Sequence, residues 1–300
     1  MHLIVTGSGA GGGFPQWNCR CRFCASAWQG DRNLPRRTQA SLAVSADGMR
    51  WVLVNCSPDI REQITATPPL QPKNAPRGSP IVAIVLTGGE VDQLGGLLSL
   101  REKTAFALYA PTSVLELLSE NPIFAALDPD LVSRHELTPG QAVCLPGGLA
   151  VWPFAVPGKP PLYEERKNVA GHRPSNFTLG LRLKDTDGKT VVYIPSCASI
   201  ENELLDMIGT PEVLFFDGTL WTDDEMIAAS VGSKTARDMG HMPLSGPDGS
   251  LAALKGLRCG RKYLVHVNNT NPLNCPSSQE RRLADAAGWA VAWDGMEISL

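Results

Sequence analysis

Residues 85–97 read VLTGGEVDQLGGL, and this stretch decides the expected fold. It begins within a short apolar run, IVAIVL at 81–86, which predicts a buried strand. Two glycine pairs follow the strand, and the second is typical of the start of a helix. Between them lie three side chains able to bind a cation: Glu90, Asp92 and Gln93. None is a histidine, and oxygen donors of this kind suit iron, manganese or magnesium better than a hydrolytic zinc.

Asp92 also has a purely structural interpretation. Aspartate is a common helix N-cap, and Asp92 could cap the segment that follows Gln93. That role would explain Asp92 alone and would leave Glu90 and Gln93 unexplained. The sequence therefore favours a cation-binding cluster.

Length and composition limit the class of protein. The 300 residues suffice for a large core, and 27 basic against 30 acidic residues, with no basic stripe, argue against a nucleic-acid partner. No apolar run approaches the roughly 20 residues of a membrane helix, and the N-terminus lacks the basic region of a signal peptide. We expect a cytoplasmic protein whose eight cysteines are thiols or metal ligands and not a disulfide framework.

Strand-like apolar runs recur along the chain, and helical patterns lie between them. Turn pairs at Asp47-Gly48 and Asp187-Gly188 predict two hairpins. Five stretches have a helical pattern: 58–64, 97–103, 113–119, 200–207 and 279–287. This mixture predicts one α/β (α+β) domain over residues 1–300, with two sheets sandwiched by helices. A Pro-rich connector spans 65–80, and the long polar loop 157–174 is expected to be a lid or binding loop.

The N-terminal region offers a metal site. Gly7-x-Gly9-x-x-Gly12 matches a dinucleotide fingerprint, but no helix follows directly, so these glycines are interpreted as tight turns. Cys19-x-Cys21-x-x-Cys24 places three thiols within six residues, and thiolates are the ligands that zinc selects. A fourth ligand must come from elsewhere. Cys275, in the loop after NNTNPLN, is a candidate.

Three titratable groups stand at strand ends or in loops of the C-terminal half. Asp217 ends the run VLFFD, His241 lies in GHMPLSG, and His266 ends YLVH before an amide-rich loop. Such positions are typical of an active-site rim. A satisfied core histidine is the alternative interpretation for His266.

Together these segments resemble the metallo-β-lactamase fold, which implies an αββα sandwich of two mixed sheets flanked by helices. Its strand-end motif is written T-H-x-H-x-D-H, and only Asp92 survives here. Pro157 and Gly158 stand where its middle histidine is expected, and Ser196 where its bridging aspartate is expected, whereas His266 matches the last histidine. The resemblance therefore argues against a two-zinc hydrolytic centre.

Branches of that superfamily imply two further roles. In the ribonuclease Z-like and phosphodiesterase branches, a strand-end acid and a loop histidine form a proton-transfer pair, which Asp217 and His241 resemble. Members with an N-terminal CxCxxC zinc site take their fourth ligand three residues after the last active-site histidine. That position is Asn269 here, so Asn269 and Cys275 compete for the role.

The closest resemblance is to the pyrroloquinoline quinone (PQQ) biosynthesis protein B family. It rests on GSGAGGGFPQWNCRCRFC, LTGGEVDQLGGLLSLRE, HRPSN, FFDGTLW, MGHMPLSG and HVNNTNP, which span nearly the whole chain. The resemblance implies a role in making PQQ from a cross-linked Glu-Tyr unit. One account is an iron-dependent oxygenase that hydroxylates the tyrosine ring; the other is a carrier that transports PQQ or its precursor to the periplasm without turnover.

The sequence favours the oxygenase, with Asp92 and His266 binding Fe²⁺ and Glu90 and Gln93 as ligands or orienting partners. Asp217 is expected to hold His241, which moves a proton at the substrate oxygen. A structural Zn²⁺ is expected on the residues Cys19, Cys21, Cys24 and Asn269. Arg173 in the 157–174 loop is expected to pair with substrate carboxylates. Besides this small-molecule substrate, other PQQ-biosynthesis proteins and a second copy of the chain are considered as partners.

Overall fold

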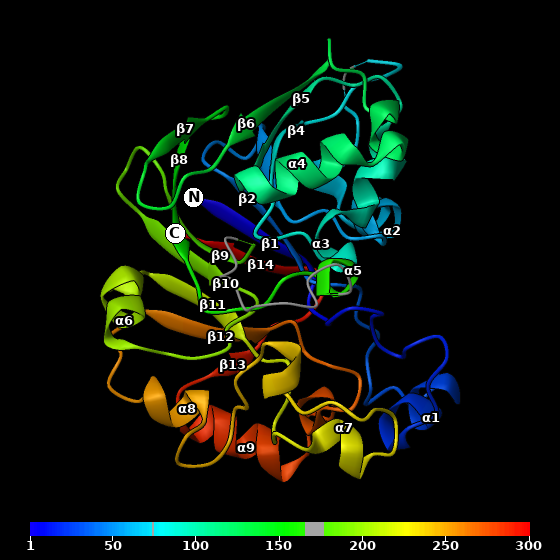
Figure 1. Cartoon of the computed structure of the whole chain (residues 1–300), viewed down its shortest axis with the longest axis vertical. Helices are drawn as coiled ribbons and strands as arrows, with labels where there is room; N and C mark the ends of the chain where they lie inside the picture. The colour runs from blue at the N-terminus through cyan, green and yellow to red at the C-terminus, as the bar shows by residue number, and fades with distance from the viewer. Residues whose placement is uncertain (74, 166–176) are drawn as a thin grey trace.

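Two mixed sheets face each other and carry helices on their outer faces (Figure 1); the computed structural model describes residues 1–73, 75–165 and 177–300. The first sheet has the order β14 (Met296–Ser299), β1 (His2–Gly7), β2 (Ser41–Ser45), β3 (Trp51–Val54), β4 (Ile81–Val85), β5 (Phe106–Ala110) and β6 (Val132–Glu136). The second has the order β13 (Ala290–Val291), β12 (Arg261–Val265), β11 (Val213–Asp217), β10 (Thr190–Ile194), β9 (Leu179–Lys184), β8 (Leu149–Ala155) and β7 (Val143–Leu145).

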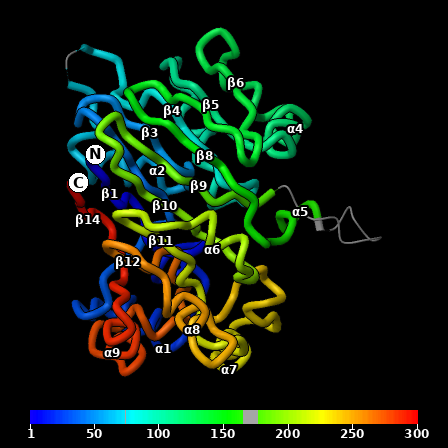
Figure 2. Tube along the Cα trace, turned by 90° about the vertical axis from the view of Figure 1, so that its left-hand side faces the viewer, coloured from blue at the N-terminus to red at the C-terminus, as the bar shows by residue number. Residues whose placement is uncertain are grey.

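Each sheet is antiparallel in one half and parallel in the other. Strands β14 to β3 pair antiparallel and β3 to β6 parallel, and the second sheet repeats this division at β10. The two predicted hairpins are confirmed, because β2 pairs antiparallel with β3 and β9 with β10. The chain ends lie side by side, since β1 pairs with β14 (Figure 2).

Short helices connect and cover the strands. The α-helices are α1 (Arg22–Trp28), α2 (Ile60–Ala66), α3 (Val91–Leu94), α4 (Thr112–Glu120), α5 (Leu162–Glu165), α6 (Asn202–Ile208), α7 (Glu225–Ala228), α8 (Ser250–Ala253) and α9 (Gln279–Ala286). The 3₁₀ turns are η1 (Pro68–Leu70), η2 (Gly95–Leu100), η3 (Pro122–Ala126), η4 (Arg237–Met239) and η5 (Pro272–Asn274). Figure 1 shows α2 and α4 beside β4 and β5 of the first sheet, and α8 and α9 beside β12 and β13 of the second.

The central strands are buried on both faces, as parallel strands between layers must be. In β4, Val85 packs into the core between the sheets and Ile84 packs under the helices of the first layer. In β11, Phe215 faces the inter-sheet core and Phe216 the second helix layer. Full burial of such a side chain contributes about 1.5–3 kcal/mol. The expected αββα sandwich is confirmed.

Some expected boundaries were wrong. The helix expected at 97–103 begins earlier, as α3 at Val91, and continues as η2 from Gly95 to Leu100, because Glu90 and Gln93 form a capping box that starts the helix there. Helix α1 was not expected, although it starts one residue after Cys21. The 65–80 connector contains η1, and the described part of the 157–174 loop contains α5.

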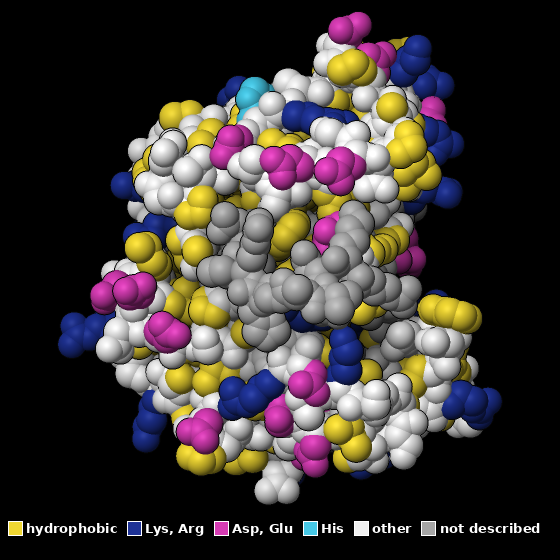
Figure 3. All heavy atoms as spheres, viewed as in Figure 1, with side chains coloured by type: hydrophobic (Ala, Val, Ile, Leu, Met, Phe, Trp, Pro, Cys, Tyr) yellow, Lys and Arg dark blue, Asp and Glu magenta, His cyan; other side chains and the backbone are white. Residues whose placement is uncertain are grey.

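Two further properties concern membrane-spanning helices and the distribution of surface charge. No helix among them is long and apolar enough to cross a membrane. On the face seen in Figure 3, basic and acidic side chains are interspersed and form no block of one sign.

Candidate active site and metal centres

Asp92 and His266 meet across the sandwich at the carboxyl ends of their strands. Asp92 lies in α3, which follows β4 of the first sheet, and His266 directly follows β12 of the second. The Nε2 atom of His266 lies 2.9 Å from the Oδ2 atom of Asp92. The structure thus brings together two residues 174 positions apart that the sequence analysis had paired.

Burial and pairing act in opposite directions on these two groups. Burial alone would raise the pKa of Asp92, but the hydrogen bond and charge of His266 hold it below its ordinary value. Burial would lower the pKa of His266, and the hydrogen bond and charge of Asp92 raise it instead. Each group therefore stabilises the charged form of the other, and their facing atoms lie where a cation could bind.

Asp217 and His241 form a second pair beside the first. Asp217 ends β11, and its Oδ2 atom accepts hydrogen bonds from His241 Nδ1 at 2.7 Å and from the backbone N–H of Cys197 at 2.9 Å. Burial would raise the pKa of Asp217, but the charge and hydrogen bond of His241 lower it. The rings of His241 and His266 stack with their centroids 5.3 Å apart.

Thr219 was missed by the sequence analysis. It is buried two residues after Asp217, and its hydroxyl oxygen lies 2.6 Å from Asp217 Oδ1, 2.8 Å from His266 Nδ1 and 3.1 Å from His241 Nδ1. Its position in FFDGT, just beyond the strand-end acid, was the available clue in the sequence.

Glu90 and Gln93 have a structural role of their own. Glu90 is the N-cap of α3, and its backbone N–H donates to the Oε1 atom of Gln93 at 3.1 Å. The N-cap interpretation of Asp92 is therefore wrong, since Glu90 holds that position and the Asp92 side chain is directed to His266. The amide oxygen of Gln93 already accepts a hydrogen bond, which fits an orienting role better than that of a metal ligand.

A cavity of about 360 Å³ opens onto these groups. Its walls include Asp92, His241 and His266 together with Lys159 and Lys234. Glu90, Gln93 and Ser196 also line it. Arg173, the expected partner of substrate carboxylates, lies outside the described residues.

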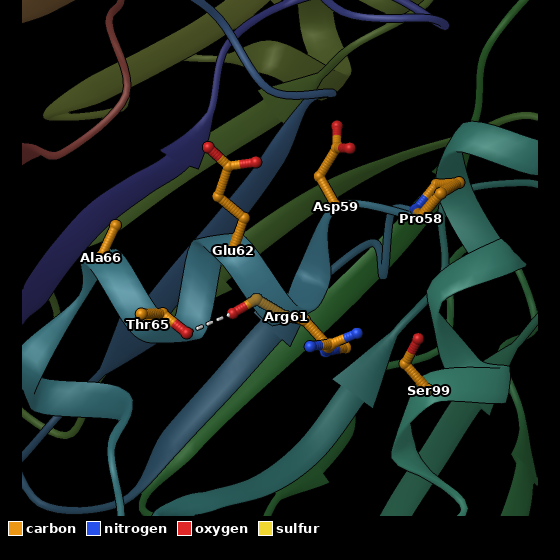
Figure 4. Close-up of a pocket in the computed structure, with 7 residues that line it drawn as sticks. All are labelled: Pro58, Asp59, Arg61, Glu62, Thr65, Ala66 and Ser99. Atoms are coloured by element: carbon orange, nitrogen blue, oxygen red, sulfur yellow. Dashed lines mark hydrogen bonds between the residues drawn. The ribbon is translucent and has the colours of Figure 1, made fainter.

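A larger hollow of about 520 Å³ lies along α2 and is a poorer candidate (Figure 4). Asp59 and Glu62 extend on one side of it and Arg61 on the other. The Asp59 carboxylate already accepts from the backbone and side-chain nitrogens of Gln39, at 2.8 and 2.9 Å. Its described lining contains neither histidine nor cysteine, so its size alone does not make it a reaction site.

The three N-terminal thiols converge as the sequence analysis expected. Cys19, Cys21 and Cys24 are buried, with their sulfur atoms within 4.8 Å of one another. Asn269 points its amide nitrogen at them, at 3.1 Å from Cys19, 3.5 Å from Cys24 and 3.8 Å from Cys21. The amide nitrogen and oxygen exchange places by a simple flip of the side chain. Cys275 instead contacts Ser277 through its sulfur, at 3.3 Å, so the loop presents Asn269 to the thiols.

This donor set fits a zinc ion. A tetrahedral site with Zn–S bonds of about 2.3 Å places its sulfur atoms about 3.8 Å apart, and the three sulfur atoms here lie within 4.8 Å of one another. The hydrogen bond from Cys24 is the main cause that lowers the pKa of Cys21 to about 5, so one thiolate is available near neutral pH. At the other centre, an imidazole nitrogen and a carboxylate oxygen 2.9 Å apart fit a single cation that accepts mixed N and O ligands.

Comparisons with known proteins agree with this geometry. Residues 50–267 match the family model described as a beta-lactamase superfamily domain. The chain is 50% identical to coenzyme PQQ synthesis protein B of Xanthomonas campestris pv. campestris (strain B100) and 47% identical to that of Methylobacterium nodulans, over the full length of each chain. The structure of Zn²⁺-bound PqqB from Methylobacterium extorquens superposes with a TM-score of 0.97, at 45% identity and over 100% of both chains.

A diphosphatase of the PhnP family shares the fold, with a TM-score of 0.69 at 22% identity, covering 100% of this chain and 97% of that one. The relatives that match over their full length indicate a narrower family than this shared fold does. The chain belongs to the coenzyme PQQ synthesis protein B family, within the beta-lactamase superfamily.

Proposed function

We propose that this protein acts in coenzyme PQQ synthesis as an iron-dependent oxygenase that hydroxylates the tyrosine ring of the Glu-Tyr-derived precursor. The names of the relatives support the pathway. The contact between His266 Nε2 and Asp92 Oδ2, on the wall of a cavity, carries the proposal of a single metal site. Few protein ligands leave room at the metal for both dioxygen and a phenolic substrate.

The chain's own residues hold the site and move the proton. His266 and Asp92 would hold Fe²⁺, which when bound supplies the one-electron chemistry that reaction with dioxygen requires. The Nδ1 atom of His241 is held by Asp217, so its Nε2 atom is left to exchange a proton with the substrate oxygen. Glu90 and Gln93 fix the start of α3 and thereby the direction of Asp92.

Two basic side chains at the cavity, beside the carboxylates of Glu90 and Asp92, support recognition of an acidic group on the substrate. Lys159 and Lys234 line the same cavity as the two histidines. The aliphatic part of the Lys159 side chain lies over Gly240, the residue before His241. A Cβ atom at position 240 would come within 2.9 Å of the Lys159 Cγ atom, so the position of this lysine beside His241 depends on that glycine. A Glu-Tyr-derived precursor carries carboxylates, and we assign their recognition to these lysines, with Arg173 as a further proposed partner.

A structural Zn²⁺ on Cys19, Cys21, Cys24 and Asn269 completes the proposal. The buried sulfur atoms and their spacing support it. This zinc would stabilise the N-terminal loop and would take no part in the oxidation, because the cavity residues belong to the other centre.

The test is anaerobic loading of the metal-free protein with ferrous iron, followed by the precursor, a reductant such as ascorbate and then oxygen. The reductant supplies the two electrons that convert the second atom of dioxygen to water when the first enters the ring. Wild type should convert the precursor to a product heavier by one oxygen atom, and Asp92→Asn should not. Asp206→Asn, on the exposed surface of α6, is the matched control and should react like wild type. If wild type binds the precursor and releases it unchanged, the carrier account holds and the oxygenase proposal is wrong.

A further inference from the structure

The Thr219 hydroxyl occupies the centre of the Asp217, His241 and His266 cluster. These three side chains are close enough to hold a metal ion, each offering an atom within 4.8 Å of the others. The Thr219 oxygen, however, lies within hydrogen-bonding distance of a facing atom of all three. On the Nδ1 side of the two imidazole rings the cluster is therefore a hydrogen-bond network. A metal must bind on the opposite side, at the Nε2 atoms.

The Thr219 hydroxyl has a single proton, and its hydrogen-bond acceptor can be identified. Asp217 accepts backbone N–H groups at both oxygens, from Cys197 at Oδ2 and from Thr219 itself at Oδ1. With His241 Nδ1 as a third donor, both carboxylate oxygens face N–H groups, an arrangement that suits the ionised form, which only accepts. The 2.6 Å contact between Thr219 Oγ1 and Asp217 Oδ1 must therefore use the threonine proton.

The direction of that bond fixes the protons on both histidines. Once Thr219 donates to Asp217, its oxygen can only accept, so His266 Nδ1 at 2.8 Å must carry a hydrogen. His241 Nδ1 likewise donates to Asp217 Oδ2 at 2.7 Å and secondarily to Thr219 at 3.1 Å. The hydroxyl then uses its one donor and both of its acceptor positions.

We infer that Thr219 is a positioning residue that fixes His266 as the Nδ1–H tautomer and so keeps its Nε2 lone pair for the metal shared with Asp92. The inference rests on the proposed metal site. Asp92 alone would favour the opposite tautomer, since a neutral His266 could donate Nε2–H to Oδ2 and its lone pair would then be at Nδ1. Thr219 opposes that arrangement, as partners of metal-binding histidines commonly do.

Two variants separate the hydroxyl from the shape of the side chain. Thr219→Val keeps the shape and removes the hydroxyl, and Thr219→Ser keeps the hydroxyl. In metal-stripped protein, at a pH where the imidazole is neutral, long-range ¹H–¹⁵N spectra should show His266 protonated at Nδ1 in wild type and Thr219→Ser. In Thr219→Val the proton should move to Nε2. Mn²⁺ uptake followed by electron paramagnetic resonance should weaken roughly 10–100-fold in Thr219→Val and little in Thr219→Ser.

Each result has a defined meaning. An Nε2–H tautomer in wild type overturns the inference without any variant, and so does an Nδ1–H tautomer that persists in Thr219→Val. Equal losses of Mn²⁺ affinity in the valine and serine variants would also overturn it, because the hydroxyl would then be irrelevant. If wild type shows the Nδ1–H tautomer but takes up no Mn²⁺, the proposed metal site fails and the assignment of Thr219 as the tautomer-fixing group stands.

Discussion

Replacing Cys21 by serine should remove the zinc proposed for the N-terminal loop. Cys21 contributes one of three buried sulfur atoms that lie within 4.8 Å of one another, and its lowered pKa makes it the readiest thiolate. A serine hydroxyl is a weak zinc ligand and stays protonated at neutral pH. The remaining two thiols and the Asn269 amide would then form an incomplete site.

The effect on stability can be worked from the size of the chain. Unfolding entropy of about 2.1 cal/mol/K per residue gives about 0.63 kcal/mol/K for 300 residues, so each kcal/mol lost lowers the melting temperature by about 1.6 °C. A ligand present at about 1,000 times its dissociation constant stabilises the native state by about 4.1 kcal/mol. Cys21→Ser should therefore melt about 6–7 °C below wild type under such conditions.

The assay combines metal analysis of purified protein with thermal unfolding at a fixed free zinc concentration. Wild type should contain about one tightly held zinc per chain in this loop, and Cys21→Ser should lose it. Cys275→Ser is the matched control, because Cys275 lies at the edge of the same apolar cluster but contacts Ser277. Full zinc content in Cys21→Ser, or an equal loss in Cys275→Ser, would refute this assignment of the ligands.

Three further predictions concern pH, packing and substrate charge. Burial raises the pKa of Glu225 from 4.5 to about 7, so the unfolded state loses this proton first and the free energy of unfolding should fall as pH rises from about 4.5 to 7. In Glu225→Gln, urea denaturation across this range should show a fall smaller by about 3 kcal/mol; an unchanged profile would contradict the shift. A Cβ at Gly96 would overlap a backbone carbonyl, so Gly96→Ala should lose at least about 1–3 kcal/mol in denaturant unfolding, whereas Gly256→Ala, with open space around it, should lose little. Lys234→Gln should weaken precursor binding in calorimetry roughly tenfold and the exposed Lys255→Gln should not; equal affinities would remove Lys234 from the site.

The layers of the fold were predictable because short sequence patterns determine which strands are buried and where the chain turns. Residues 81–86 form a continuous apolar run, which a strand buried on both faces requires, and the glycine pairs after it mark the turn into α3 and η2. The pairing of Asp92 with His266 was predictable from the resemblance, since both stand at strand ends. The capping box at Glu90 was not recognised, because the same Glu-x-x-Gln spacing also suits a ligand cluster.

Other parts of the site depend on tertiary structure that no local pattern encodes. The choice between Asn269 and Cys275 depends on how the loop after β12 passes the thiols, and both residues lie within ten positions of His266. The position of Thr219 beside Asp217 was a clue that it lies near the site, but its contacts with two histidines 22 and 47 positions further along the chain depend on the assembled fold. Hydroxyl contacts of this kind appear only once the strands are assembled.

The loop that starts at His266 connects the two centres physically. His266 has a φ of 62°, a left-handed conformation that costs a residue other than glycine about 1–3 kcal/mol unless its neighbours hold it there. The next residues supply that restraint: Asn268 donates its backbone N–H to the carbonyl of Thr219 at 3.0 Å, and the Asn271 side chain donates to that of Gly218 at 2.9 Å.

Between these two anchors Asn269 reaches the thiols. A zinc bound there would restrain the same short segment that holds His266 in its strained conformation. Loss of that zinc should then loosen the loop and weaken metal binding at His266, although Cys21 lines no wall of the active-site cavity. The structural centre would in this way act on the reaction through a backbone only three residues long, because the strain at His266 persists only while the loop around it is held.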